Sequence, residues 1–149
     1  MELSAKGLAL IKRFEGFSAT PYKCSAGVPT IGYGSTYYED GRPVQMDDPA
    51  ISEEWAEALL INVVRTFEKA VNSMIQQELT QNQFDALVSF TYNVGTEAFK
   101  KSTLLKRVNN NPFDSDINRQ FLKWVNAGGK VRAGLVKRRQ KEAQLYFTA

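Results

Sequence analysis

The sequence predicts an α+β fold with a small antiparallel sheet near its start and helices elsewhere. Residues 20–41 alternate glycines and prolines with short stretches rich in Val, Ile, Thr and Tyr, which is typical of short strands and turns. The flanking segments instead repeat apolar residues every three or four positions, the period of a helix. Because every predicted strand lies in the first third of the chain, sheet and helices are segregated, as in α+β architectures.

The first predicted helix begins after Ser4, a suitable N-cap, and ends before Gly16, since glycine commonly follows a helix end. Leu8, Ile11 and Glu15 recur at steps of three and four residues, so they share one helix face. We therefore expect Glu15 to leave the helix on its apolar side.

The predicted sheet contains a strand at residues 28–33. Gly32 and Gly34 lie at its end, where the absence of side chains lets a ligand or another backbone approach closely. A loop at 47–50 then leads to Ser52, the predicted N-cap of a long helix that reaches about residue 75.

The remaining sequence predicts further helices. Thr80 and Gln83 form a capping-box pattern at the start of one helix, and Gly95 is its predicted end. Phe84, Phe90, Tyr92, Phe121 and Trp124 occur at helical spacing and are predicted core residues. The shorter helices are predicted at residues 102–108, 117–125 (ended by Gly128 and Gly129) and 135–147.

A chain of 149 residues fits one domain with its own core. The expected organisation is a sheet-containing lobe at about 15–51, a connecting helix at about 52–76 and a helical lobe at about 77–149. The N-terminal helix, residues 4–14, is assigned to the helical lobe.

Composition excludes several kinds of catalysis. The chain has no histidine, which removes the commonest general base and metal ligand, so zinc hydrolase, Ser-His-Asp and Cys-His mechanisms are excluded. Its single cysteine cannot form an internal disulfide. Catalysis must rest on carboxylates, hydroxyls, the thiol or lysine, and we expect neither a metal nor a cofactor.

Charge and hydropathy indicate where the chain acts. Residues 130–141 hold six cations and no acid within a net charge of +3, which is typical of a polyanion-binding face or of a solvated helix face. No apolar run approaches the roughly 20 residues that span a bilayer, so we expect no stable membrane insertion. The first 14 residues lack a signal-peptide pattern, and we expect the chain to accumulate in the cytoplasm of the cell that makes it.

Glu15, Cys24 and Thr30 are the candidate catalytic residues. Breaking a glycosidic bond needs an acid that protonates the leaving oxygen and a second group that activates water or attacks the sugar. Glu15 is placed for the first role, and Cys24 with Thr30 for the second. Each residue also has a purely structural interpretation: a helix-end acid paired with a base such as Arg138, a small buried thiol, and an ordinary strand threonine.

Other polar and aromatic residues near this segment are weaker candidates. The carboxylates of the following loop lie in polar sequence and are predicted to be solvated surface groups with ordinary pKa values; they are Glu39, Asp40, Asp47 and Asp48. Tyr33, Tyr37 and Tyr38 are predicted either to line a sugar cleft or to pack, with Tyr33 the favoured substrate-binding residue.

Three blocks in order make the chain resemble the phage-type lysozymes, the endolysins of glycoside hydrolase family 24. The first block holds Glu15-Gly16, Pro21-Tyr22 and Pro29-Thr-Ile-Gly-Tyr-Gly34 around Cys24. The second runs from Leu79 to Gly95. The third contains Trp124-Val-Asn-Ala-Gly-Gly129, Gly134-Leu-Val-Lys-Arg-Arg139 and Glu142, so the likeness covers nearly the whole chain.

The resemblance implies a lysozyme-like fold and a muramidase that cleaves between N-acetylmuramic acid and N-acetylglucosamine in peptidoglycan, with substrate between the two lobes. Glu15 would be the general acid, while Cys24 and Thr30 position water or stabilise the sugar cation. Cys24 stands where the family more commonly has Asp. A C-terminal arginine, Arg138 or Arg139, is expected to pair with Glu15. We expect a monomer that needs a holin to reach the wall and then lyses the host.

Four alternatives remain open at this stage. Two keep the wall as target: a noncatalytic peptidoglycan-binding module, and a lytic transglycosylase, against which the pair of Cys24 and Thr30 argues. The third is a cationic protein that disrupts membranes through residues 135–147. Nucleic-acid binding is the fourth, and no recognised motif supports it beyond the basic run.

Overall fold

The computed structural model describes residues 1–149 and contains two compact units. We call Ala9–Thr66 the strand unit, and Met1–Leu8 together with Phe67–Ala149 the helical unit. The first and second helices each contribute residues to both units. The prediction of one domain with a connecting helix stays a prediction.

Helix α1 (Ala5–Glu15) begins and ends where its capping residues predict. The hydroxyl oxygen of Ser4 accepts a hydrogen bond from the backbone N–H of Gly7 at 3.2 Å. Gly16, with φ of +72°, donates its N–H to the Lys12 carbonyl at 2.9 Å and ends the helix. Glu15 is therefore the last helical residue.

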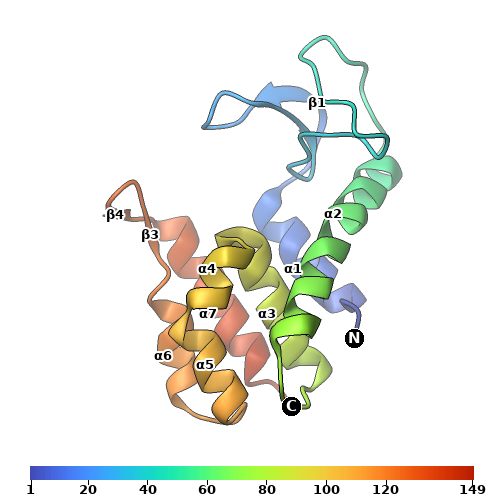
Figure 1. Ribbon diagram of the computed structural model, residues 1–149. Coiled ribbons are helices and arrows are strands. Elements are labelled where there is room, and N and C mark those ends of the chain that lie inside the picture. Colours follow the sequence, from blue (N-terminus) through green and yellow to red (C-terminus); the bar gives the residue numbers. More distant parts are fainter. The chain divides into compact units, whose positions relative to one another are not determined.

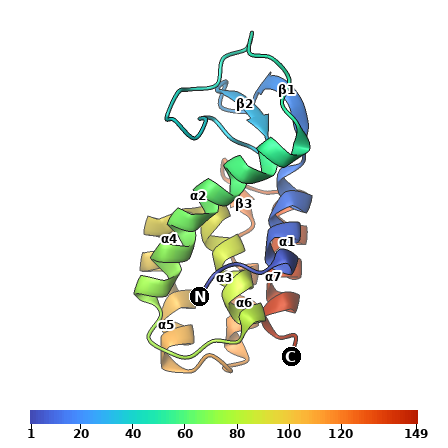
Figure 2. The same cartoon turned by 90° about the vertical axis from the view of Figure 1, so that its right-hand side faces the viewer.

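The strand unit contains the predicted small antiparallel sheet. Strand β1 (Ser18–Lys23) pairs with β2 (Pro29–Gly32), and the two lie side by side in Figure 2. Tyr22 stands opposite Thr30, so the residues on either side of the connecting turn come together. Single bridges from Ile31 to Ser35 and from Tyr37 to Pro43 follow the sheet.

Helix α2 (Glu53–Met74) is the long helix predicted after Ser52. The Ser52 hydroxyl oxygen accepts a hydrogen bond from the N–H of Trp55 at 3.1 Å, which satisfies one of the unpaired amides of the first turn. Glu53 and Glu54 lie in that turn, where negative charge is favourable.

The helical unit is built around α3 (Gln81–Val94), which is buried from Gln83 to Thr91. Helix α3 packs against α7 (Ala133–Tyr146), and α7 packs against α6 (Asp116–Leu122). Helices α4 (Thr96–Lys101) and α5 (Thr103–Asn110) complete the unit, as Figure 1 shows.

The cap and core of α3 agree with the sequence. The Thr80 hydroxyl oxygen accepts from the Gln83 N–H at 3.1 Å, and the Gln83 side chain accepts from the Thr80 N–H at 2.9 Å, which confirms the capping box. The predicted core aromatics Phe84, Phe90 and Phe121 are fully buried. The predicted Tyr92 and Trp124 are half-buried, although the ring of Trp124 meets that of Phe90 edge-on at 5.5 Å.

The prediction that all strands lie in the first third of the chain is wrong. Helix α6 ends at Leu122, and β3 (Asn126–Ala127) then pairs with β4 (Lys130–Val131) in a small hairpin. Gly128 and Gly129 form its turn with φ of +60° and +78°. Two glycines suit a hairpin turn as well as a helix end, and two-residue strands are too short to show a pattern.

Helix α7 is a packed element rather than an exposed amphipathic helix. Arg138, Arg139, Glu142, Ala143 and Tyr146 are all buried. This burial argues against the interpretation of residues 135–147 as a membrane-disrupting surface helix, because most of the apolar face that would insert is at least half-buried. Of its residues, Tyr146 is buried, Leu135, Val136 and Leu145 are half-buried, and Phe147 is exposed. No helix of the structure is both long and apolar enough to cross a membrane.

Candidate active site

Glu15 is half-buried at the end of α1, and its carboxylate lies close to the backbone of Gly34. A side-chain carbon built on Gly34 would be 3.1 Å from Glu15 Oε1. Glycine is therefore the residue that leaves the carboxylate undisturbed at this point. The end of α1 and the segment after β2 are brought together as the predicted role of Glu15 requires.

Cys24 lies in the turn between β1 and β2. The Gly27 N–H donates to the Cys24 carbonyl at 2.8 Å, and the Cys24 N–H donates to the Val28 carbonyl at 3.1 Å, which fixes the turn. Hydrogen bonds donated by the backbone N–H groups of Val28 and then Ala26 lower the pKa of the Cys24 thiol, against the opposing effect of burial. The turn therefore stabilises the thiolate.

Thr30 lies on β2, 3% exposed, beside Cys24. Its hydroxyl donates to the Val28 carbonyl at 2.9 Å and contributes, after the two amides, to the lowered pKa of the Cys24 thiol. The hairpin thus brings together the two residues predicted to handle water or the sugar cation. The strand unit contains all three predicted catalytic residues.

The source of the lowered Cys24 pKa is not visible in the sequence. A neighbouring cation such as Lys23 is the usual cause that a sequence suggests. In the structure the causes are turn amides and a hydroxyl. The sequence feature that indicates this turn is Gly27, whose φ of +78° lets the turn close.

The burial of Tyr33 argues against the prediction that it binds the sugar. Its ring is 4% exposed and lies 5.4 Å from the ring of Phe17, between centroids. Its hydroxyl donates to Glu53 Oε1 at 2.7 Å, and burial together with Glu53 raises the pKa of Tyr33 to about 12. The residue is built into the strand unit.

One loop carboxylate departs from the predicted surface behaviour. Asp48 is half-buried and accepts hydrogen bonds from the Gln45 N–H at 2.9 Å and the Tyr38 hydroxyl at 2.8 Å, which lower the pKa of its carboxyl group. It therefore holds the loop together. Glu39, Asp40 and Asp47 are exposed, as predicted.

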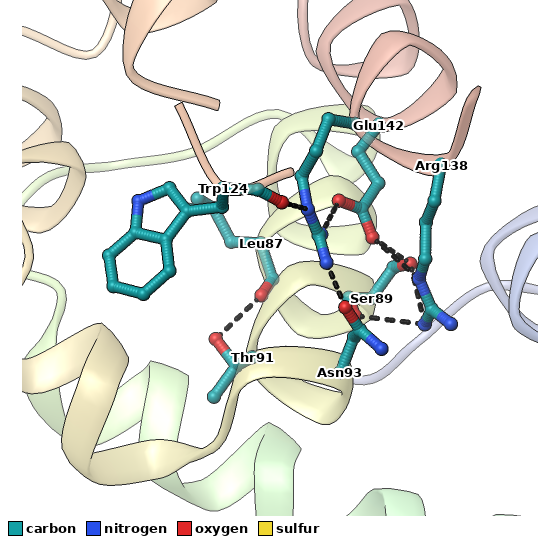
Figure 3. A network of polar contacts seen from close by, with 8 residues as sticks. Leu87, Ser89, Thr91, Asn93, Trp124, Arg138 and Glu142 are labelled. Atoms are coloured by element: carbon teal, nitrogen blue, oxygen red, sulfur yellow. Dashed lines mark hydrogen bonds and ion pairs between the residues drawn. The ribbon is translucent and has the colours of Figure 1, made fainter. Parts of the chain in front are cut away.

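Arg138 belongs to a buried polar network in the helical unit (Figure 3). Its Nε donates to Glu142 Oε2 at 3.2 Å and its Nη2 to the Ser89 carbonyl at 3.1 Å. Arg139 donates to Glu142, to Asn93 and, at 2.9 Å, to the Trp124 carbonyl. The predicted ion pair between Arg138 and Glu15 stays a prediction.

Glu142 is the shared acceptor of this network. Burial raises the pKa of its carboxyl group, while the guanidinium groups of Arg139 and Arg138 and the Ser89 hydroxyl act in the opposite direction. The Ser89 hydroxyl donates to Glu142 Oε2 at 2.5 Å. Two of the six cations that the sequence shows in residues 130–141 are therefore buried and paired, so the basic run is not one continuous surface.

No group of three or more His, Cys, Asp or Glu side chains is arranged to hold a metal ion. Glu15, Cys24 and Thr30 offer a carboxyl group, a thiol held among amide donors, and a hydroxyl.

Comparisons with known proteins agree with this fold. Residues 12–142, which include Glu15, Cys24 and Thr30, match the family described as Phage lysozyme. The endolysin of Bacillus phage B103 is 48% identical across 99% of this chain, which spans 55% of that relative's length. The endolysin of Acyrthosiphon pisum secondary endosymbiont phage 1 is 40% identical, with both chains fully covered.

A solved structure has the same fold. The endolysin from Escherichia coli O157:H7 phage FAHEc1 superposes with a TM-score of 0.91 and 43% sequence identity, covering 99% of this chain and 94% of that one. The fold is thus that of a lysozyme-type glycoside hydrolase. The chain belongs to the phage lysozyme family, whose members are muramidases that degrade peptidoglycan.

Proposed function

We propose that this chain is an endolysin that hydrolyses the β-1,4 bond between N-acetylmuramic acid and N-acetylglucosamine in bacterial peptidoglycan. Glu15 acts as the general acid, protonating the leaving oxygen while positive charge develops on the sugar. The observation that supports the proposal is the turn that holds Cys24, where the backbone amides of Val28 and Ala26 lower the pKa of the thiol. Thr30, whose hydroxyl donates to the Val28 carbonyl, lies beside it. Such a turn prepares a polar, partly anionic group where the second catalytic function is needed.

Cys24 and Thr30 supply that second function. A thiolate near the anomeric carbon stabilises the oxocarbenium-like transition state by its charge. A neutral thiol and the Thr30 hydroxyl instead orient the attacking water. The lowered thiol pKa favours the first role for Cys24. The 2.9 Å hydrogen bond that Thr30 donates to the Val28 carbonyl keeps its hydroxyl fixed for the second role.

The biological setting follows from the family. The partner is the peptidoglycan of the host, and the outcome of bond cleavage is host lysis. We propose that the chain acts as a monomer, accumulates in the host cytoplasm, and reaches the wall once a holin opens the membrane. The names of its relatives, which are endolysins of phages, support this sequence of events.

Digestion of purified peptidoglycan tests the proposed reaction. The wild-type chain, Glu15→Gln and the control Glu39→Gln are compared by mass spectrometry of the released fragments. Glu39 is exposed and accepts a hydrogen bond from the Trp55 indole at 3.0 Å, so its variant reports the effect of losing a loop carboxylate. We expect reducing N-acetylmuramic acid ends from the wild type and from Glu39→Gln but not from Glu15→Gln.

Two other outcomes each point to a different function. Anhydromuramic ends would assign the chain as a lytic transglycosylase. Wall binding without release of fragments by the wild type would contradict the enzyme assignment and leave a noncatalytic binding module.

A further inference from the structure

The segment Gly32-Tyr33-Gly34 begins at the last residue of β2, and each of its residues contacts a different part of the strand unit. Gly32, with φ of +66°, lies against α2, because a side-chain carbon built on it would be 2.9 Å from the Cβ of Ala56. That position leaves no room for a larger residue. The end of β2 is therefore seated directly on the helix surface.

Tyr33 fixes the same segment through its hydroxyl and its ring. The hydroxyl donates to Glu53 on α2 at 2.7 Å. The Lys12 ammonium group lies 5.3 Å from the ring centroid and forms an ion pair with Glu57 at 2.5 Å. Tyr33 thus links the first turn of α2 to the last turns of α1, the helix that carries Glu15.

Gly34, the next residue, lies beside the Glu15 carboxylate. A side-chain carbon at Gly34 would be 3.1 Å from Glu15 Oε1, closer than nearly all such contacts in real structures. Its φ of +89° also lies in the region that L-residues with side chains rarely adopt. Any side chain here must push the Glu15 carboxylate away.

We propose that Gly34, held in place by Tyr33 and Gly32, is a positioning element that sets where the Glu15 carboxylate sits for proton transfer. This inference rests on the proposed function, because it assigns a role relative to the general acid. Gly34 touches the catalytic group rather than the substrate and is therefore a positioning residue.

The first test compares Gly34→Ala with Gly41→Ala. Gly41 has φ of +85°, and a side-chain carbon there would meet nothing within 4 Å. Both variants carry the same backbone strain, but only Gly34→Ala displaces Glu15. The Glu15 carboxylate must yield by a few tenths of an ångström. Since a displacement of about 1 Å costs on the order of 100-fold in rate, we expect Gly34→Ala to lower kcat on purified walls by about threefold to tenfold, with little change in KM.

The control and the thermal midpoints separate positioning from folding. Gly41→Ala should keep wild-type kcat and KM while its melting temperature falls as much as that of Gly34→Ala. A Gly34→Ala variant with wild-type kcat contradicts the proposal. So does an equal loss of kcat in Gly41→Ala, since strain alone would then explain the effect.

The second test removes a hydroxyl and keeps the ring. Tyr33→Phe loses the bond to Glu53, and Tyr38→Phe loses the similar buried bond to Asp48 at 2.8 Å. A hydrogen bond of this kind is worth on the order of a fivefold change in an equilibrium. We expect kcat to be about fivefold lower for Tyr33→Phe and unchanged for Tyr38→Phe. An equal loss of kcat in both variants would overturn the role of Tyr33.

The Glu15→Gln variant distinguishes a failure of the proposed function from a failure of the positioning role. If Glu15→Gln retains hydrolysis, the proposed function fails whatever the glycine variants do. If Glu15→Gln is inactive while Gly34→Ala keeps full activity, only the positioning role fails.

Discussion

The thiol of Cys24 is the residue whose chemistry depends most on its local backbone. Its turn directs the N–H groups of Val28 and Ala26 at the sulfur, which is how backbone amides form binding sites for anions. A thiol in water is mostly neutral at pH 7. Amide donors therefore favour the anionic form of this cysteine without a neighbouring cation.

The titration of Cys24 follows from these contacts. Its pKa is lower in the folded chain than in the unfolded chain, so the thiolate appears at lower pH when the protein is folded. The rate of alkylation by iodoacetamide should rise with pH around a midpoint below that of the urea-unfolded chain. Thr30→Val, which removes one donor, should move that midpoint up. A folded midpoint at or above the unfolded one would contradict the described turn.

Substitution of Cys24 tests its catalytic role. Cys24→Ala removes the thiol that we propose to handle water or the sugar cation, and contributions of this kind are about 10²–10⁴-fold in rate. We expect a loss of at least about 100-fold in wall hydrolysis for Cys24→Ala. Cys24→Asp restores a carboxylate and should stay within about tenfold of wild type. Full activity in Cys24→Ala would assign the thiol a structural role.

At this scale the sequence indicates which residues are candidates for the site but not what surrounds them. The sequence predicts Cys24 and Thr30 as a pair, and the hairpin brings them beside each other. The burial of Tyr33 is not predictable, because alternation on a four-residue strand leaves both faces open. It depends on Phe17 and Glu53, which are distant in sequence.

At the scale of elements, the starts of helices are predicted best, because capping residues mark them in the sequence. Ser4, Ser52 and Thr80 each cap the helix that they were predicted to cap, because a side-chain oxygen pairs locally with an amide of the first turn. Helix α4 and the β3–β4 hairpin were missed. Six-residue helices and two-residue strands are stabilised by packing rather than by a sequence pattern.

Helix α6 contains a charged cluster that makes stability depend on pH. Asp116 accepts hydrogen bonds from Arg119 Nε at 2.7 Å and Gln120 Nε2 at 2.9 Å, and Arg107 lies at 3.2 Å. These contacts lower the pKa of Asp116 from 3.8 to about 2. Their contribution is therefore present above pH 3.8 and is lost as the pH falls towards 2.

Asp116→Asn tests this dependence. Above about pH 4 the variant should melt at a lower temperature than the wild type. The difference should shrink as the pH is lowered, because the wild-type carboxyl group then becomes neutral as well. A difference in melting temperature that stays constant from pH 5 to about pH 2 would show that Asp116 is not titrating as its contacts require.

At the scale of the whole molecule, the two units are stabilised differently. The helical unit buries two guanidinium groups and one carboxylate next to an aromatic core, with Arg139 lying 4.9 Å from the centroid of Phe90. In the sequence these arginines belong to a run of cations without an acid. Glu142 comes directly after that run. Only the helical geometry of α7 shows that its carboxylate pairs with both Arg138 and Arg139.

Removing Glu142 should cost far more stability than removing an exposed partner. Glu142→Gln leaves two buried cations without their carboxylate, and breaking a buried pair in this way typically costs about 3–5 kcal/mol. Glu57→Gln breaks the pair with Lys12, whose partners are 25% and 40% exposed, and should cost under about 1 kcal/mol. Urea unfolding measures both. Equal losses would show that the buried network contributes no more than a surface ion pair.

The central claim is that the strand unit carries a hydrolytic site with Glu15 as its acid. The most direct test is digestion of peptidoglycan in water enriched in oxygen-18, followed by mass spectrometry of the fragment ends. Hydrolysis predicts one oxygen-18 atom at each new reducing N-acetylmuramic acid end, and no new ends from Glu15→Gln. Anhydromuramic ends without the label, or labelled ends from Glu15→Gln, would contradict the claim.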